Sequence, residues 1–431
     1  MSERKLTGHT QRNIRSSNLH VVLSMFRRSH TLTIRDITEK TGLSKTAVSK
    51  IINELLAREL ILPAGKGISS ESGGKRPDLF ELSTKNTFAI TAAFLPNLIT
   101  VSIYDASLTL VYSERRTPDS PDSPACVIPY GGLEPIFRYE AAVSVLAEML
   151  QHSMLKNGLK PEQIAGITVS SVGIVESETG TLVTTLISKA WPDNLPLVAD
   201  LRLQLPFSCH IYADNISRFA AYNYLWEKPQ RYQQNIVVLY CDTSVGGAYI
   251  RNGHLVHGKR GLVGEYGHIT TDYTFKSQCA CGRTGCFESI VARSAIEARV
   301  RNELVNWPES ILNSYPDAPN VTIDDLFRAA DQGDRFARLQ VDLVARQFSI
   351  ILYNFQIMYD PDEIIISAYC VQQIRYFEES VNRQMSYFAG HRDMNLVIST
   401  ASDPLFYKSL LNSGAAAFCL DQYYANEALS D

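Results

Sequence analysis

The sequence of 431 residues lacks the features that mark exported and membrane-spanning proteins. It holds no run of about eighteen apolar residues, which excludes a transmembrane helix. Its polar, basic N-terminus has no apolar segment of the kind that secretory signals contain. Five of its eight cysteines are scattered singly, which argues against a disulfide framework. We therefore expect a cytoplasmic protein without membrane insertion.

The composition is that of an ordinary globular protein, with 45% hydrophobic and 20% charged residues. The length predicts about three domains. The net charge of −4 is unevenly distributed, because residues 1–80 carry 14 Lys and Arg against 7 Asp and Glu, and the remainder carries 27 against 38. A basic N-terminal part on an acidic body indicates a nucleic-acid-binding domain at the N-terminus.

The N-terminal part has the pattern of three helices. Residues 13–28 are amphipathic. A second helix begins after Thr33, which forms a capping-box pattern with Asp36, and ends before Gly42. Ser44 is a good N-cap for a third helix. The apolar residues of this third helix form one stripe: Val48, Ile51, Ile52, Leu55 and Leu56.

The opposite face of the third helix is polar and basic. This pattern predicts a helix-turn-helix whose second helix enters the DNA major groove. Lys45, Thr46 and Ser49 are placed to contact base edges, and Lys50 to contact a phosphate. The alternative is a three-helix module that binds another protein.

Residues 60–82 predict a wing, which consists of two short strands around a loop rich in glycine and serine. Arg76 lies beside this loop and is placed to reach a minor groove. The alternative is a linker that merely carries charge.

Four potential metal ligands lie close together further along the chain. Cys279, Cys281 and Cys286 fall within eight residues, and His268 precedes the first of them by eleven. Thiolate and imidazole are ligands that tetrahedral Zn²⁺ prefers, and a closed set of three cysteines and one histidine is typical of a structural zinc site. The alternative is a group of free thiols without a metal.

Glycines and carboxylates surround these four ligands. Gly282 and Gly285 permit the tight turns that so short a loop needs. Glu265 and Glu288 lie on either side of the cysteines. Ionised carboxylates accept strong hydrogen bonds from hydroxyl groups, so this arrangement suits a ligand with several hydroxyls.

The motif G-E-Y-G-H followed by C-A-C-G-R-T-G-C-F-E resembles the signature of the ROK family of repressors and sugar kinases. The resemblance implies an α/β protein: an N-terminal winged helix-turn-helix followed by a two-lobed, actin-like body of the sugar-kinase type. It places the winged helix at residues 1–82 and the lobes at residues 83–213 and 214–431, with the last helix allowed to return to the first lobe. It also implies that Glu265, His268 and Glu288 line a sugar site, with His268 serving both metal and sugar.

Asp214 is the predicted sugar contact outside this motif. It follows a strand at residues 210–212, and a carboxylate at the C-terminal end of a strand is placed for a ligand. In the family an Asn-Asp pair binds sugar at this position, but Ala213 replaces the asparagine here. The alternative is that Asp214 caps a helix beginning near Ser217.

The nucleotide-binding features of the kinases are changed at three places. Residues 92–96, A-A-F-L-P, stand where kinases have Asp-x-Gly-x-Thr. Ser244 and Ala248 interrupt a glycine-rich phosphate loop, and residues 367–368, Ser-Ala, replace a glycine pair. Phosphoryl transfer needs a metal and amide donors around the phosphate. We therefore expect the body to have lost ATP binding and the protein not to be an enzyme.

The remaining pattern predicts a β-hairpin at residues 88–103, helices at 139–155 and 191–205, and a strand at 164–175. Together these features predict a repressor of sugar-metabolism or transport genes. It would bind double-stranded operator DNA as a homodimer or homotetramer and respond to a sugar or sugar derivative. The alternatives are an active sugar kinase with a DNA-binding domain, and a regulator controlled by a protein partner instead of a sugar.

Overall fold

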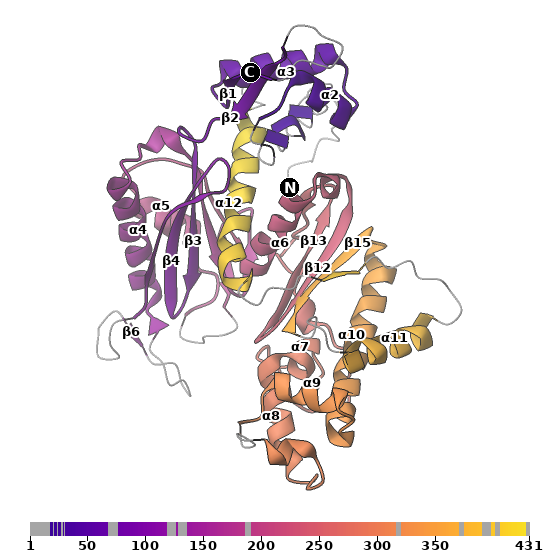
Figure 1. Ribbon diagram of the computed structural model, residues 1–431. Helices are drawn as coiled ribbons and strands as arrows, with labels where there is room; N and C mark the ends of the chain where they lie inside the picture. The colour runs from indigo at the N-terminus through magenta and orange to yellow at the C-terminus, as the bar shows by residue number, and fades with distance from the viewer. Residues whose placement is uncertain are drawn as a thin grey trace. The chain divides into compact units, whose positions relative to one another are not determined.

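In the computed structural model the chain forms two compact units (Figure 1). The first consists of Met1–Pro229 and Leu410–Asp431, and the second of Gln230–Ser409. No helix among the described residues is both long and apolar enough to span a membrane. The described residues are 18–19, 21–23, 25–26, 29, 31–67, 76–118, 126–127, 136–185, 191–315, 320–369, 375–389, 398–400 and 406–427.

The first unit begins with the winged helix that the sequence predicts. Thr33 and Asp36 form the expected capping box, Gly42 ends the second helix at a φ of 70°, and Ser44 caps the next helix. The described residues between 18 and 26 are helical, and the rest of the predicted helix at 13–28 lies outside the described residues. The wing strands pair antiparallel. These elements are α2 (Ile34–Thr41), α3 (Lys45–Ala57), β1 (Ile61–Lys66) and β2 (Asp78–Leu82).

A mixed five-stranded sheet forms the centre of the first unit, in the order β11-β8-β3-β4-β5. The β3–β4 hairpin confirms the prediction for residues 88–103. An apolar cluster joins one face of this sheet to α4 and α5. The elements are β3 (Phe88–Leu95), β4 (Leu98–Asp105), β5 (Leu110–Arg116), β8 (Ile164–Ser171), β11 (Ile211–Asn215), α4 (Tyr139–Lys156), α5 (Leu197–Gln204), α6 (Ile216–Glu227) and α12 (Phe406–Glu427). The short strands are β6 (Cys126–Val127), β7 (Ile136–Phe137), β9 (Ile174–Glu176) and β10 (Thr181–Thr184).

Two predicted elements of the first unit are wrong in extent. The strand expected at 164–175 ends at Ser171, because Gly173 adopts a φ of 89° and turns the chain into β9. The helix expected at 191–205 begins only at Leu197. Before it, Leu195 pairs with Leu182 as an isolated bridge, which keeps the segment extended.

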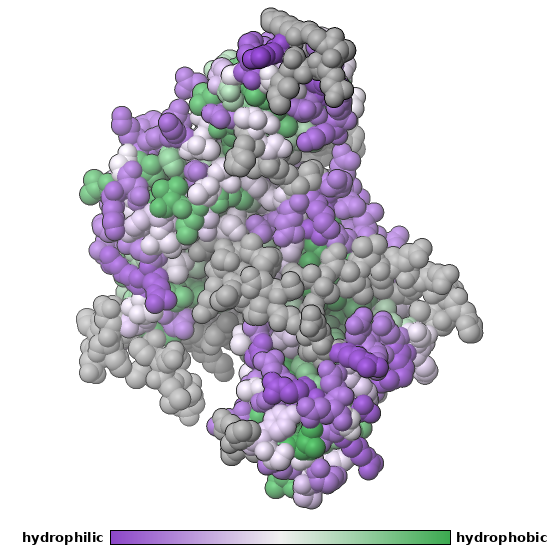
Figure 2. Space-filling view, viewed as in Figure 1, coloured by the Kyte–Doolittle hydropathy of each residue, from purple (hydrophilic) through white to green (hydrophobic). Residues whose placement is uncertain are grey.

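The second unit also contains a five-stranded sheet, in the order β14-β13-β12-β15-β16, with helices packed on it. Figure 2 shows mainly hydrophilic side chains on the visible surface of the region of α8, α9 and α10, whose apolar sides line the core. The strands are β12 (Asn235–Cys241), β13 (Val245–Arg251), β14 (His254–Leu255), β15 (Glu363–Ala368) and β16 (Ile398–Thr400). The helices are α7 (Phe287–Val291), α8 (Arg293–Leu304), α9 (Ile323–Asp331), α10 (Arg335–Tyr359) and α11 (Arg375–Ala389).

The chain passes from the first unit to the second between Pro229 and Gln230, after α6. It returns between Ser409 and Leu410, within α12. The compact units therefore place α6 with the first sheet, because this helix is buried along almost its whole length there. The division into domains at residues 82 and 213 stays a prediction.

Candidate functional site

The polar face of α3 is exposed, as a DNA-reading helix requires. Lys45, Thr46 and Lys50 are exposed and Ser49 is half-buried. Four of the five residues of the apolar stripe are buried in the core of the winged helix, with Val48 and Leu55 fully inaccessible, and Leu56 is half-buried. Burial of this stripe fixes which side of the helix faces solvent.

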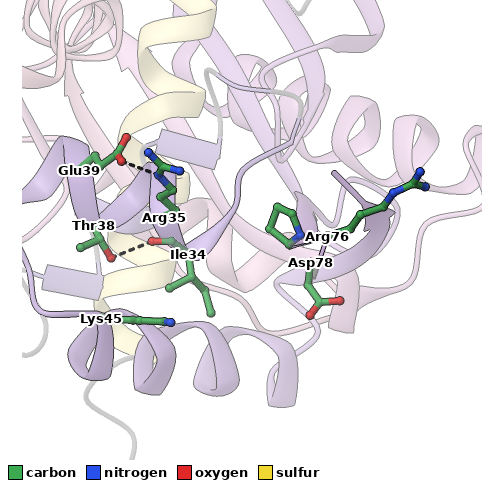
Figure 3. A pocket seen from close by; sticks show the side chains of 8 residues that line it. Ile34, Arg35, Thr38, Glu39, Lys45, Arg76 and Asp78 are labelled. Carbon is green, nitrogen blue, oxygen red and sulfur yellow. Dashed lines mark hydrogen bonds and ion pairs between the residues drawn. The ribbon is translucent and has the colours of Figure 1, made fainter. Parts of the chain in front are cut away.

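A depression of about 500 Å³ lies between α2, the start of α3 and the base of the wing (Figure 3). Lys45 and Arg76, two of the predicted DNA contacts, both line it. Arg35 of α2 also lines it and pairs with Glu39 at 2.6 Å. The structure therefore brings cationic side chains of the helix-turn-helix and the wing to one surface. The predicted wing tip at 73–75 lies outside the described residues.

In the second unit, four side chains come together in the geometry of a metal site. The ligand atoms of His268, Cys279, Cys281 and Cys286 all lie within 4.8 Å of one another. The Sγ atoms of Cys281 and Cys286 are 3.6 Å apart, and Nδ1 of His268 is 3.5 Å from Sγ of Cys279. A site that can hold a metal ion thus exists where the sequence predicts one.

Two glycines shape the loop that carries the cysteines. Gly282 and Gly285 have φ values of 85° and 73°, in the left-handed region that favours glycine. A Cβ atom at Gly285 would lie 2.2 Å from the carbonyl oxygen of Asp272, so the loop also needs the missing side chain there. The expectation of glycine-dependent turns is confirmed.

The surroundings of the four ligands influence their protonation. Burial lowers the pKa of His268, which favours the neutral imidazole that binds metals. Burial raises the pKa of Cys279 to about 12, so in the absence of a cation this thiol stays protonated at neutral pH. A metal ion would supply the positive charge that stabilises the thiolate.

Glu288 borders this cluster. One carboxylate oxygen, Oε2, accepts a hydrogen bond of 2.8 Å from the backbone N–H of Val245, and the other lies 3.8 Å from Sγ of Cys279. Glu288 is half-buried at the start of α7. Glu265, also half-buried, directly precedes the short 3₁₀ helix Tyr266–His268. The second unit therefore holds three of the four predicted sugar contacts.

A close approach of two backbones positions the G-E-Y-G-H segment. A Cβ atom at Gly264 would lie 2.4 Å from the carbonyl oxygen of Gly247. A Cβ atom at Gly247 would lie 2.5 Å from the ring of Tyr266. Gly247 in β13 thus allows the segment to pack against the sheet, a role that the sequence pattern did not reveal.

Asp214, the fourth predicted sugar contact, lies in the first unit at the end of β11. Its Oδ1 accepts a hydrogen bond of 2.5 Å from Arg218 and another of 2.7 Å from the backbone N–H of Asn215. The side chains of Asp214 and Arg218 are only 2% and 1% exposed. The alternative that Asp214 caps α6 is wrong, because Asn215 accepts from the N–H of Ser217 and is the cap. The sequence analysis missed this ion pair, which joins the end of β11 to the first turn of α6.

A second ion pair lies at the turn that follows β12. Asp242 accepts a hydrogen bond of 2.6 Å from the side chain of Arg293, and the backbone N–H of Arg293 donates to the carbonyl of Asp242 at 2.7 Å. The guanidinium also lies 5.6 Å from the ring centre of Tyr369, which follows β15. The sequence analysis did not identify this group. The carboxylate of Asp242 thus lies just before the segment from Ser244 to Ala248, which stands where the kinases have a glycine-rich phosphate loop.

Family models match two parts of the chain. The ROK family model matches residues 139–408, and a MarR family model matches residues 20–66, which contain the helix-turn-helix. The predicted winged helix followed by a sugar-kinase-like body is therefore confirmed.

Individual proteins show the same relationship. The chain is 23% identical over 371 residues to a xylose repressor of Caldicellulosiruptor bescii, and this match covers 85% of this chain and 87% of that protein. It is 30% identical over 225 residues to a glucokinase of Halalkalibacterium halodurans, which covers 52% of this chain and 67% of that one. In fold it is similar to the crystal structure of a ROK family transcriptional regulator, a homologue of the E. coli MLC protein, with a TM-score of 0.71, 16% identity and coverage of 96% and 99%. Because the ROK model matches more than half of its length, the chain belongs to the ROK family.

Proposed function

We propose that the protein is a DNA-binding transcriptional repressor of sugar-metabolism or transport genes that binds a sugar or sugar derivative without phosphorylating it. One observation supports this most strongly. The chain combines α3, whose exposed face is basic, with a ROK body that contains Glu265, Glu288 and the metal-ligand cluster. Lys45, Thr46 and Ser49 would contact bases, while Lys50 and Arg76 would contact the DNA backbone and minor groove. Its target would be a double-stranded operator, bound by a homodimer or homotetramer.

Structural zinc is the metal that fits the cluster best. Zinc binds thiolate sulfur at about 2.3 Å, so a tetrahedral site places two sulfur atoms about 3.8 Å apart. The observed separation of 3.6 Å between Cys281 and Cys286 agrees with this geometry. A set of three thiols and one imidazole leaves no open position, which favours a structural role. Zinc would hold His268 and, through the adjoining loop, Glu265 and Glu288.

The sugar would be held mainly by hydrogen bonds to carboxylates. Glu265 and Glu288 accept hydrogen bonds from hydroxyl groups, and the ring nitrogen of His268 that does not face Cys279 is available to the sugar in this proposal. Asp214 would be a further contact whose orientation Arg218 fixes.

Three features support the absence of phosphoryl transfer. The turn between β3 and β4 consists of Pro96 and Asn97 and lacks the carboxylate that the kinase motif Asp-x-Gly-x-Thr supplies. Just before the segment compared with a phosphate loop, Asp242 pairs with Arg293, so this guanidinium is already occupied by a carboxylate. Asp214 Oδ1 already accepts a hydrogen bond from the buried guanidinium of Arg218, so this oxygen is not free to take a proton from a sugar hydroxyl.

To test the proposal, the purified protein is used to select DNA duplexes from a random pool. The complex of the protein with the selected duplex is then titrated with D-xylose, D-glucose and N-acetyl-D-glucosamine. We expect a specific duplex to be enriched and at least one sugar to change its affinity. A Lys45→Ala/Lys50→Ala variant should lose the DNA, and an exposed Lys85→Ala variant should retain it. Failure to enrich any duplex, or enrichment by the double variant, would contradict the proposal.

An active sugar kinase is a second candidate, favoured by the similarity to a glucokinase. ATP-dependent phosphorylation of any of these sugars by the pure protein would establish it. Control by a protein partner is a third, favoured by the buried, arginine-paired state of Asp214. Capture of a specific protein, together with the absence of sugar binding in calorimetry, would support this third reading.

A further inference from the structure

The last helix, α12, connects three parts of the molecule. The chain leaves the second unit within this helix, between Ser409 and Leu410, and most of the helix belongs to the first unit. A continuous helix carries displacement and rotation along its axis, because its hydrogen bonds resist local bending. The second unit is therefore joined to α12 by the chain itself.

One side of α12 packs on α6, the helix that begins directly after Asp214. A Cβ atom at Gly414 would lie 2.1 Å from the carbonyl oxygen of Phe219, so the two helices touch through backbone there. The ring of Phe418 lies 5.1 Å from that of Phe219 and 5.4 Å from that of Tyr222. One turn further on, the buried hydroxyl of Tyr222 donates to Asp421 at 2.7 Å.

The other side of α12 lies in an apolar cluster that also contains the core of the winged helix. A single apolar cluster contains the buried stripe of α3, the wing residue Phe80 and four residues of α12. The same cluster includes Ala89, Tyr104, Ala106 and Ala165 of the first sheet and its turns, so the core of the winged helix is continuous with that of the sheet and α12. The four residues of α12 are Ala416, Cys419, Leu420 and Tyr424, all of which are at most 1% exposed.

The path from the predicted sugar contact to the recognition helix is short. Asp214 holds Arg218 in the first turn of α6, and Phe219 is the next residue. Phe219 contacts α12, and α12 contacts the same core as α3. Closely packed interfaces of this kind respond to a shift by repacking, because they are not continuously deformable.

We infer that α12 transmits ligand binding in the body to the winged helix, and that Gly414 is the position that keeps α12 seated on α6. The inference rests on the proposed function, because it names how that function is regulated. A ligand that favours one arrangement of the body changes the position of α12, and α12 changes the orientation of α3. Coupling of this kind typically alters affinity by about 5- to 150-fold.

The test compares Gly414→Ala with two other variants. Alanine is a better helix former than glycine, so this change leaves α12 helical but forces it away from Phe219. Tyr222→Phe removes the hydroxyl that donates to Asp421 and keeps the ring that packs against Phe418. Gln422→Ala, at a half-buried position of the same helix, is the matched control. Circular dichroism and zinc content establish that each variant is folded.

Hydrogen exchange provides a readout that needs neither DNA nor sugar. In Gly414→Ala we expect the amides of α3 and α12 to exchange about ten-fold faster or more, while those of α10 in the second unit keep their rates. Tyr222→Phe should show a smaller effect in the same direction, and Gln422→Ala none. Unchanged exchange in α3 of folded Gly414→Ala would overturn the inference, even if the protein proves not to respond to sugars.

Regulation is measured as the ratio of the dissociation constants of the selected duplex with and without the effective sugar. Wild-type protein and Gln422→Ala should have the same ratio, whereas the ratio of Gly414→Ala should move to about 1.0. The affinity of Gly414→Ala for the sugar in the absence of DNA should stay within about three-fold of the wild-type value. A Gly414→Ala variant that keeps the wild-type ratio contradicts the role of α12. A wild-type ratio of about 1.0 means that the sugar does not change DNA affinity, which contradicts the proposed function. In that case the hydrogen-exchange experiment alone tests the role of α12.

Discussion

Asp214 in the first unit and Glu288 in the second are both predicted sugar contacts, but the structure surrounds them differently. Asp214 is almost completely buried and its Oδ1 accepts a hydrogen bond from the guanidinium of Arg218. Glu288 is half-buried, and its Oε2 accepts from the neutral N–H of Val245. An arginine partner offsets the charge of the first carboxylate, whereas an amide only orients the second. The comparison teaches that an acidic residue in a family motif takes its role from its partners, and it points to the second unit as the stronger hydroxyl acceptor.

Removal of zinc should have the largest effect on this comparison. Zinc binding contributes about 10–16 kcal/mol in zinc-finger peptides, and all four potential ligands lie within residues 268–286 of one loop. We expect a chelator, or Cys286→Ser, to abolish zinc binding, expose residues 268–287 to hydrogen exchange and eliminate sugar binding through Glu288. Zinc analysis and exchange measurements check this.

Cys209→Ser, in the first unit, is the matched control and should retain zinc. Residues around Asp214 should keep their exchange rates in the zinc-free protein. If sugar binding survives complete loss of zinc, the metal does not organise the site.

Replacing Arg218 by methionine should have the next largest effect. The change leaves the carboxylate of Asp214 buried without its partner, which typically costs about 3–5 kcal/mol. We expect the free energy of unfolding of the first unit, measured in urea, to fall by this amount. Arg202→Met, at an exposed position, should change it by less than about 0.5 kcal/mol.

The double variant Asp214→Asn/Arg218→Met separates the ion pair from simple packing. It removes both charges, so most of the lost stability should return. A double variant as unstable as Arg218→Met alone would show that the packing of the arginine, and not its charge, is what matters.

Conversion of Glu288 to glutamine tests the comparison directly. A hydrogen bond to a charged group contributes about 1.5–3 kcal/mol, so sugar affinity should fall by about 10- to 150-fold in calorimetry. Asp214→Asn should reduce it by less, because Arg218 already occupies that carboxylate. Glu309→Gln, at an exposed position, should leave sugar affinity unchanged. A larger effect of Asp214→Asn than of Glu288→Gln would reverse the comparison.

The smallest expected effect concerns DNA and leaves both carboxylates intact. Lys50→Ala should weaken binding of the selected duplex by a similar factor for every sequence and reduce the slope of log K against log salt by about one. Sugar affinity should not change. A change in sequence preference would indicate that Lys50 contacts a base and not a phosphate.

The sequence predicted the winged helix well because its information is local. Capping residues such as Thr33 and Ser44 act within one turn, and the apolar stripe of α3 has the period of a helix. The metal-ligand cluster was equally accessible, because Cys279, Cys281 and Cys286 are close in sequence and glycine permits the necessary turns. The helix expected at 191–205 was wrong in its first half because Leu195 pairs with a distant residue, Leu182, and such pairing leaves no local signal.

The residues that the sequence analysis missed share the same reason. Arg293 meets Asp242 across 51 positions, and Gly247 is needed because the ring of Tyr266 lies against it. Neither contact follows from periodicity or from a motif. Asp214 shows the limit most clearly, since its motif suggested a ligand contact while its surroundings add a buried cation.

By itself, the sequence determined the types of element and the chemistry of the metal ligands, because caps, periodicity and ligand spacing act over a few residues. Only the tertiary structure decided which charges are neutralised. It also decided that α12 joins the core of the winged helix to α6. Arg293 and Asp242, and Gly414 and Phe219, are far apart in the chain, so only packing within each unit brings them together, and burial of the Asp214–Arg218 pair is likewise a property of the packed core.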